Sequence, residues 1–172
     1  GPGQVCVLQL GAAHVGPFED RIDKRTAEVG DAHVGAAEVG AGEIALAKKD
    51  FARASTYFEQ AAKRSPDSAA IRTELGIARL AEGDSRAMAD LQAAAGMEGE
   101  STRADTFIIL NHLRNKQFDA ALASIASLEK KQPDSPLVWN YRGAAYLGKQ
   151  DRARARESFG KALKLNPGFF PA

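Results

Sequence analysis

Apolar and small residues recur at helical spacing through most of the chain, and near the C-terminus they form two linked sets. In the stretch PLVWNYRGAAYLGKQDRARARESFGKALKLNP, Trp139 and Tyr146 flank Gly143, which places a small residue between two large ones on one helical face. The second half of the stretch has Phe159 between two alanines at the same kind of spacing, and it stops at Pro167. These spacings predict two short helices that pack face to face, with the Trp139 ring between them.

The same pattern recurs toward the N-terminus at intervals of one unit. Pro133 lies 34 residues before Pro167, and Pro66 lies 67 before Pro133, which leaves room for two units with one residue missing. The predicted units are 36–68, 69–101, 102–135 and 136–168. We expect the same place in the four second helices to hold Ala54, Met88, Ala121 and Ala155. Four residues later we expect a large side chain in each unit, namely Phe58, Ile125 and Phe159, with Gln92 as the exception.

The first helices of these units are less uniform. The second unit has Arg72 and Arg79 where the last unit has Trp139 and Tyr146, so we expect it to bury less apolar area. Helix starts are indicated by serines at N-cap positions, namely Ser68, Ser101 and Ser135. Pro136 follows the last of these at the first helical position, where its missing N–H costs nothing.

Residues 1–35 do not fit the pattern and predict an irregular segment. Each glycine in the wider stretch would weaken a helix by about 1 kcal/mol; these glycines are at positions 11, 16, 30, 35, 40 and 42. Two interpretations stay open: a degenerate repeat, because Phe18 lies 33 residues before Phe51, or an altered, non-native segment. We expect the stretch from Ala36 to Lys48 to form the first helix of the first full unit.

Paired helices that repeat at about 34 residues resemble the tetratricopeptide repeat. The resemblance implies an all-α fold, a right-handed alpha solenoid of helix-turn-helix units that binds other proteins. Residues 36–172 would hold four such units, and NPGFFPA at the end matches the start of a fifth. Phe169 and Phe170 would then belong to an incomplete unit, and we expect weak self-association through them.

Three stretches of the sequence show a more particular resemblance, within about Gly42 to Ala172. They are ALAKKDFARASTYFEQAAKRSPDS, ARLAEGDSRAMADLQAAA and the long run from ILNHLRNKQF to NPGFFPA. They resemble the long tetratricopeptide lipoproteins of the bacterial PEP-CTERM and exosortase system, which accompany exopolysaccharide gene clusters. The resemblance implies a periplasmic or envelope-associated factor in protein sorting or assembly. This chain is shorter and has no apolar run ahead of Cys6, so we expect a fragment of a longer array and do not carry the family's membrane attachment over to it.

Charge and hydropathy narrow the classes of partner. The 23 basic and 22 acidic residues leave a formal net charge of +1, which provides no long-range field to attract nucleic acid or acidic lipid. No run approaches the roughly 18 apolar residues of a membrane-spanning helix, and no basic segment precedes an apolar stretch at the N-terminus. We therefore expect no nucleic-acid partner, no signal peptide and no direct insertion into a membrane.

Candidate chemistry is sparse. The histidines His14, His33 and His112 have no pair at the spacing of three or four residues that places two metal ligands on one helical face. Cys6 lies in the least regular segment, and no glycine-rich phosphate loop follows a strand. We expect no enzyme activity, no catalytic residue, no metal site and no cofactor.

The remaining candidate is a binding groove. In stacked helical pairs the first helices line the concave side. The residues predicted to face it are Ala70, Thr73, Ile77, Leu80, Arg103, Thr106, Leu110, Leu113, Leu137, Asn140, Ala144 and Leu147. Because this face is mostly apolar, the sequence predicts a protein or peptide ligand with apolar side chains. The alternative is a structural spacer or oligomerisation element within a longer repeat array, in which the groove would be covered.

Overall fold

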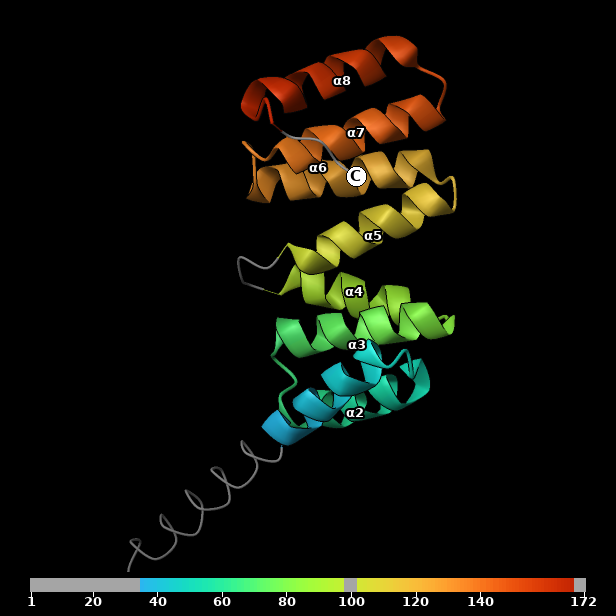
Figure 1. The fold of residues 1–172 in the computed structure, drawn as a ribbon, viewed down its shortest axis with the longest axis vertical. Coiled ribbons are helices and arrows are strands. Elements are labelled where there is room, and N and C mark those ends of the chain that lie inside the picture. The colour runs from blue at the N-terminus through green and yellow to red at the C-terminus, as the bar shows by residue number, and fades with distance from the viewer. Residues whose placement is uncertain (1–34, 98–101, 169–172) are drawn as a thin grey trace, which may run out of the picture. The chain divides into compact units, whose positions relative to one another are not determined.

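A computed structural model describes residues 35–97 and 102–168, and every regular element in these ranges is a helix (Figure 1). Residues 35–47 are helical. The helices that follow are α2 (Phe51–Arg64), α3 (Ala69–Glu82), α4 (Ala87–Gly96), α5 (Arg103–Arg114), α6 (Phe118–Lys131), α7 (Pro136–Gly148) and α8 (Arg152–Leu165). They belong to one compact unit, Gly35–Ala172, and the all-α prediction is confirmed. Phe18, named for a degenerate repeat, and Phe169 and Phe170, named for self-association, lie outside the described residues.

The helices pack in chain order, each on the next (Figure 1). We call 35–47, α3, α5 and α7 the first helices, and α2, α4, α6 and α8 the second helices. Contacts also join α3 to α5 and α5 to α7. The first helices of successive pairs therefore lie side by side and share one surface.

Each turn from a first to a second helix contains one residue with positive φ. These residues are Lys49 (59°), Gly83 (86°), Lys116 (57°) and Gln150 (64°). The left-handed conformation reverses the chain within a few residues, and glycine adopts it without steric cost only at Gly83. Five positions separate this residue from the first buried alanine of the second helix, except in the second pair, where Gly83 and Ala87 are four apart. The missing residue therefore lies in this turn.

The expectation that Met88 and Gln92 occupy the repeated places of α4 is wrong. Ala87 and Leu91 are the buried residues there, whereas Met88 is half-buried and Gln92 is exposed. The reason is the short turn before α4, which shifts the whole helix by one residue relative to a strict spacing of 34. With that shift every second helix follows the rule, because Leu91 takes the place of Phe58 and Ile125.

Glycines on the first helices make room for the large side chains of the second helices. A methyl group on Gly42 would lie 2.8 Å from the Phe58 ring, and one on Gly143 would lie 2.5 Å from the Phe159 ring. Gly76 stands in the same relation to Leu91, at 2.7 Å. Gly42 is therefore a packing position, although the sequence places it among the glycines that weaken the N-terminal stretch.

Replacing Gly42 with Ala should lower the free energy of unfolding by about 1–3 kcal/mol, because Phe58 has to move and is fully buried. The control is Gly40→Ala on the same helix, where the added methyl group meets nothing within 4 Å. This variant should gain about 0.5–1 kcal/mol from helix propensity. Urea denaturation followed by circular dichroism measures both, and a stabilising Gly42→Ala would contradict the packing.

The predicted N-caps hold in part. Ser68 caps α3, and its hydroxyl accepts a hydrogen bond from the amide of Ile71 at 3.3 Å. Ser135 lies at the N-cap of α7 without a side-chain bond, and Pro136 is the first helical residue as expected. Helix α5 begins after Thr102, while Ser101 lies outside the described residues.

The two arginines of α3 do not occupy equivalent environments. Arg79 is buried, and its guanidinium binds Glu59 of α2 at 2.9 Å and Asp90 of α4 at 2.5 Å. Arg72 is half-buried and donates to the carbonyl of Pro66 at 3.3 Å. The second unit thus replaces the apolar contact of the tyrosine position with a buried ionic contact that joins three helices.

The Trp139 ring contacts both helices of the last pair but is not fully buried, so the expectation of a ring between them holds in part. It is half-buried, with the Arg142 guanidinium 4.7 Å and the Lys161 ammonium 4.5 Å from its centroid. These cations lie over the aromatic ring and partly shield it. The core of the last two pairs is instead built around Ile125, Val138 and Tyr141.

Candidate ligand groove

The predicted groove residues lie on α3, α5 and α7, which share the surface of the first helices. The exposed ones are Ala70, Arg103, Leu110 and Leu147. The half-buried ones are Ile77, Leu80, Thr106, Leu113, Leu137, Asn140 and Ala144, and the buried one is Thr73. The face is therefore accessible along most of its length but is not uniform.

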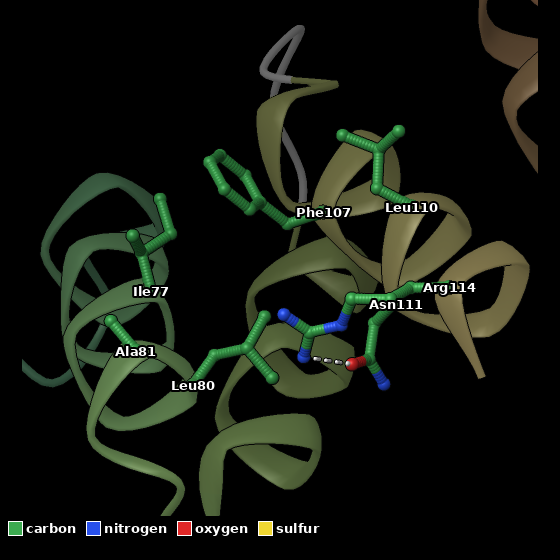
Figure 2. A pocket seen from close by; sticks show the side chains of 7 residues that line it. All are labelled: Ile77, Leu80, Ala81, Phe107, Leu110, Asn111 and Arg114. Atoms are coloured by element: carbon green, nitrogen blue, oxygen red, sulfur yellow. Dashed lines mark hydrogen bonds between the residues drawn. The ribbon is translucent and has the colours of Figure 1, made fainter.

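A cavity of about 250 Å³ lies between α3 and α5 on this surface. Its lining consists of Ile77, Leu80, Ala81, Phe107, Leu110, Asn111 and Arg114. Figure 2 shows the α3 side chains facing those of α5 across the cavity, with Phe107 and Leu110 along one side. Because five of these seven residues are apolar, the cavity suits an apolar side chain of a ligand.

Three of the lining residues were predicted from the sequence: Ile77, Leu80 and Leu110. The other four were not predicted; they are Ala81, Phe107, Asn111 and Arg114. On α3, Ala81 lies four residues after Ile77, and on α5 Arg114 lies four after Leu110. A wider helical stripe that included these neighbours would have found them.

Two predicted residues face the protein interior. The Thr73 hydroxyl donates to the carbonyl of Ala69 at 2.7 Å, and its side chain is buried. Thr106 donates to the carbonyl of Thr102 at 3.0 Å and also lies against Tyr141 of the next first helix. Burial raises the pKa of Tyr141, and the hydrogen bond with Thr106 opposes that rise.

Two predicted leucines also contribute mainly to the core. Leu113 and Leu137 are half-buried and pack against the cluster that includes Ile125, Val138 and Tyr141. Leu147 is exposed but lies away from the α3–α5 cavity, and lines a hollow with side chains of α8. The structure thus concentrates the accessible apolar part of the groove between α3 and α5.

Charges at the start of α5 are largely neutralised. The Arg103 guanidinium pairs with Glu74 of α3 and lies 6.0 Å from the centroid of the Phe107 ring. Burial raises the pKa of Glu74, the nearby Glu43 adds to the rise, and Arg103 opposes it. Arg103 therefore has a partner within the chain and offers little net charge to a ligand.

The polar end of the cavity is formed by α5. Arg114 donates a hydrogen bond to the Oδ1 atom of Asn111 at 3.3 Å (Figure 2). Asn111 is buried, and its Nδ2 atom lies 3.2 Å from the Met88 sulfur. Within the described ranges Arg114 forms no ion pair, so its exposed guanidinium can contact a polar group of a ligand.

Residues 35–97 and 102–168 contain no cluster of three His, Cys, Asp or Glu side chains that could hold a metal ion. His112 lies 2.8 Å from the Oε1 atom of Gln117 in the α5–α6 turn. Cys6, His14 and His33 lie outside the described residues. No helix in the described part of the chain is long and apolar enough to cross a membrane.

Comparison with solved structures shows the same architecture in other proteins. MamA (residues 41 to the end) from Desulfovibrio magneticus RS-1 has a TM-score of 0.66 at 20% identity, covering 77% of this chain and 76% of that chain. YrrB, described as a TPR protein with an unusual peptide-binding site, has a TM-score of 0.65 at 20% identity, covering 88% and 82%. MamA from AMB-1 has a TM-score of 0.62 at 17% identity, covering 83% and 76%. These similarities confirm the solenoid fold.

The sequence itself matches models of the tetratricopeptide repeat in two places, residues 39–101 and residues 136–169. Together these matches span more than half of the chain. No curated protein matches the sequence. The repeated helix pairs, the small residues that receive large ones, and these matches show that the chain belongs to the tetratricopeptide repeat family.

Proposed function

We propose that this chain is a protein-binding scaffold whose ligand inserts an apolar side chain into the α3–α5 cavity. The observation that carries this proposal is an accessible apolar cavity on the surface of the first helices, with Leu110 43% exposed at its edge. Apolar hollows with a few polar groups at one end are typical ligand sites. The description of YrrB as a peptide-binding protein of the same fold is consistent with this function.

The ligand should present apolar side chains from a helix or an extended segment. Recognition of an acidic tail is less well supported, because Glu74 already pairs with Arg103. Arg114 lies at the rim and can orient a polar group of the ligand, such as a backbone carbonyl. Buried apolar area should therefore supply most of the affinity.

The alternative function is a spacer or oligomerisation element, in which another helix or another copy would cover this surface. No residue in the described ranges covers the α3–α5 cavity, which favours an open binding surface. For the biological setting we propose the bacterial envelope, as part of a protein sorting or assembly system associated with exopolysaccharide. That setting rests on the sequence resemblance alone, and fractionation of the source cells with an antibody to this chain tests it.

The cavity is tested with peptides selected by the wild-type chain from a displayed peptide library. Leu110→Ser should weaken their binding about tenfold or more, because the cavity loses an apolar wall. The matched control is Leu165→Ser, since Leu165 on α8 is 44% exposed but does not line the cavity. Fluorescence anisotropy measures the dissociation constants of both variants.

The same titrations at low and high ionic strength separate apolar from charged recognition. We expect the affinity to change less than about threefold, because exposed charge pairs are screened by salt and apolar contacts are not. A steep loss of affinity with salt, together with no effect of Leu110→Ser, would contradict the apolar cavity. Failure to select any peptide would favour the spacer.

A further inference from the structure

The last second helix, α8, carries an open hollow of about 480 Å³ that shares no lining residue with the α3–α5 cavity. Its side chains are Leu147, Arg152, Ala155, Arg156, Phe159 and Leu163, and we call these residues the α8 slot. Leu147 and Leu163 are 54% and 45% exposed, among the most exposed large apolar residues of the described chain. The α8 slot is therefore an apolar surface with two arginines at one end.

The equivalent face of α6 is covered by α7, which gives an internal template for what the α8 slot accepts. Ile125 of α6 is fully buried in a cluster with Val138 and Tyr141 of α7. The Phe118 ring packs on Gly148 at the end of α7. Because the start of α6 meets the end of α7, the covering helix runs antiparallel to the helix beneath it.

The α8 slot uses the same helix positions as the face of α6 but differs from it in chemistry at three of them, each found 34 residues after its equivalent on α6. Arg152 replaces Phe118, and Arg156 replaces Leu122, which packs against the α6–α7 core. At the opposite end Leu163 replaces Glu129, which binds Arg142 of α7 at 2.6 Å.

The two arginines have no acidic partner in the part of the chain that the structure describes. The ion pairs of α8 instead involve Arg154 with Asp151 and Lys161 with Glu157. Arg152 and Arg156 are both exposed at the edge of the α8 slot. A covering helix with carboxylates at that end would supply the missing opposite charge.

We propose that the α8 slot binds an amphipathic helix of a partner protein that runs antiparallel to α8. Apolar side chains of that helix face Phe159 and Leu163, and carboxylates in its last turn face Arg152 and Arg156. This surface is separate from the α3–α5 cavity, so the inference goes beyond the proposed function.

A second copy of this chain is a poorer occupant. The helix that would enter the α8 slot in the template's manner is 35–47, with Ala41 in the place of Arg142 and Ala47 in the place of Gly148. Lys48 and Lys49 follow immediately. These lysines would lie near Arg152, and like charges across an interface disfavour association.

The probe is a synthetic, side-chain-stapled peptide of residues 136–149 that carries Arg142→Leu, Gly148→Glu and Lys149→Glu. Its twin has lysine at both of the last two positions. We expect the acidic peptide to bind the wild-type chain. The lysine twin should bind at least about tenfold more weakly. Fluorescence anisotropy of the labelled peptides measures both affinities.

Variants of the chain locate the binding. Arg156→Glu should reverse the preference, so that the lysine twin binds more tightly than the acidic peptide. Lys130→Glu makes the same change in charge at an exposed site on α6 and should leave the preference intact. Leu163→Ser should weaken both peptides, whereas Leu165→Ser, outside the α8 slot, should not.

Equal binding of the two peptides, or an equal effect of Arg156→Glu and Lys130→Glu, would overturn the proposal. So would sedimentation of the chain alone as a dimer that Leu163→Ser dissociates, because a second copy would then occupy the α8 slot. Leu110→Ser should leave the binding of these peptides unchanged, which separates this surface from the groove.

Discussion

Replacing Phe58 with Ala should lower the free energy of unfolding by about 3–5 kcal/mol, whereas Phe159→Ala should cost about half as much. Both rings occupy the same place in their units, and each faces a glycine of its first helix. Phe58 is fully buried because the next first helix, α3, contributes Leu75 and Ala78 to its cluster. Phe159 is half-buried at the α8 slot.

Urea denaturation of the two variants beside the wild type measures the difference, and the identical chemical change makes each the control for the other. Equal losses would mean that Phe159 is as well covered in solution as Phe58. In that case a helix occupies the α8 slot without added ligand, and the measurement should then be repeated at several protein concentrations. A concentration-dependent midpoint would identify a second copy as that helix.

The second large effect is expected at Arg79. Arg79→Ala should cost about 3 kcal/mol or more, because it leaves the partly buried carboxylate of Asp90 without its cation. The control is Arg103→Ala, which removes an ion pair with Glu74 from an arginine whose side chain is 56% exposed. That change should cost less than about 1 kcal/mol, as exposed pairs do.

Thermal and urea denaturation of both arginine variants test this difference. The loss at Arg79 should also appear as faster amide exchange in α2 and α4, because the two carboxylates closest to its guanidinium, those of Glu59 and Asp90, lie on those helices. A loss at Arg79 no greater than at Arg103 would show that solvent already reaches the buried pair.

The helical architecture follows from the sequence because helix spacing, prolines and small residues act locally. Trp139, Gly143 and Tyr146 are four and three residues apart, a spacing that a helix places on one face, and Pro167 marks where the last helix ends. Met88 and Gln92 were assigned to the places that Ala87 and Leu91 occupy, because the second unit is one residue shorter than the others and no local pattern shows where the residue is lost. The structure places that absence in the turn at Gly83.

The environments of individual side chains depend on contacts between units, which one sequence does not reveal. Arg79 is charged and would be expected at the surface, but carboxylates from two other helices compensate its burial. Thr73 lies on the predicted groove face, yet its hydroxyl bonds to its own helix and it turns inward. Leu110 and Ile77 were predictable because the apolar stripe of a first helix is broad. Such residues stay on the groove face even when the helix is rotated slightly about its axis.

The turn that contains the left-handed residue is the place where the second unit differs in length from the other units. The spacing from the first buried alanine of a second helix to the start of the next unit is the same after α2 and after α4: Ala54 to Ala69, and Ala87 to Thr102. The irregularity of the second unit is therefore confined to its own turn and does not reach its neighbours. A gene that gained or lost a whole unit at these junctions would encode a longer or shorter array in which every remaining groove position keeps its orientation.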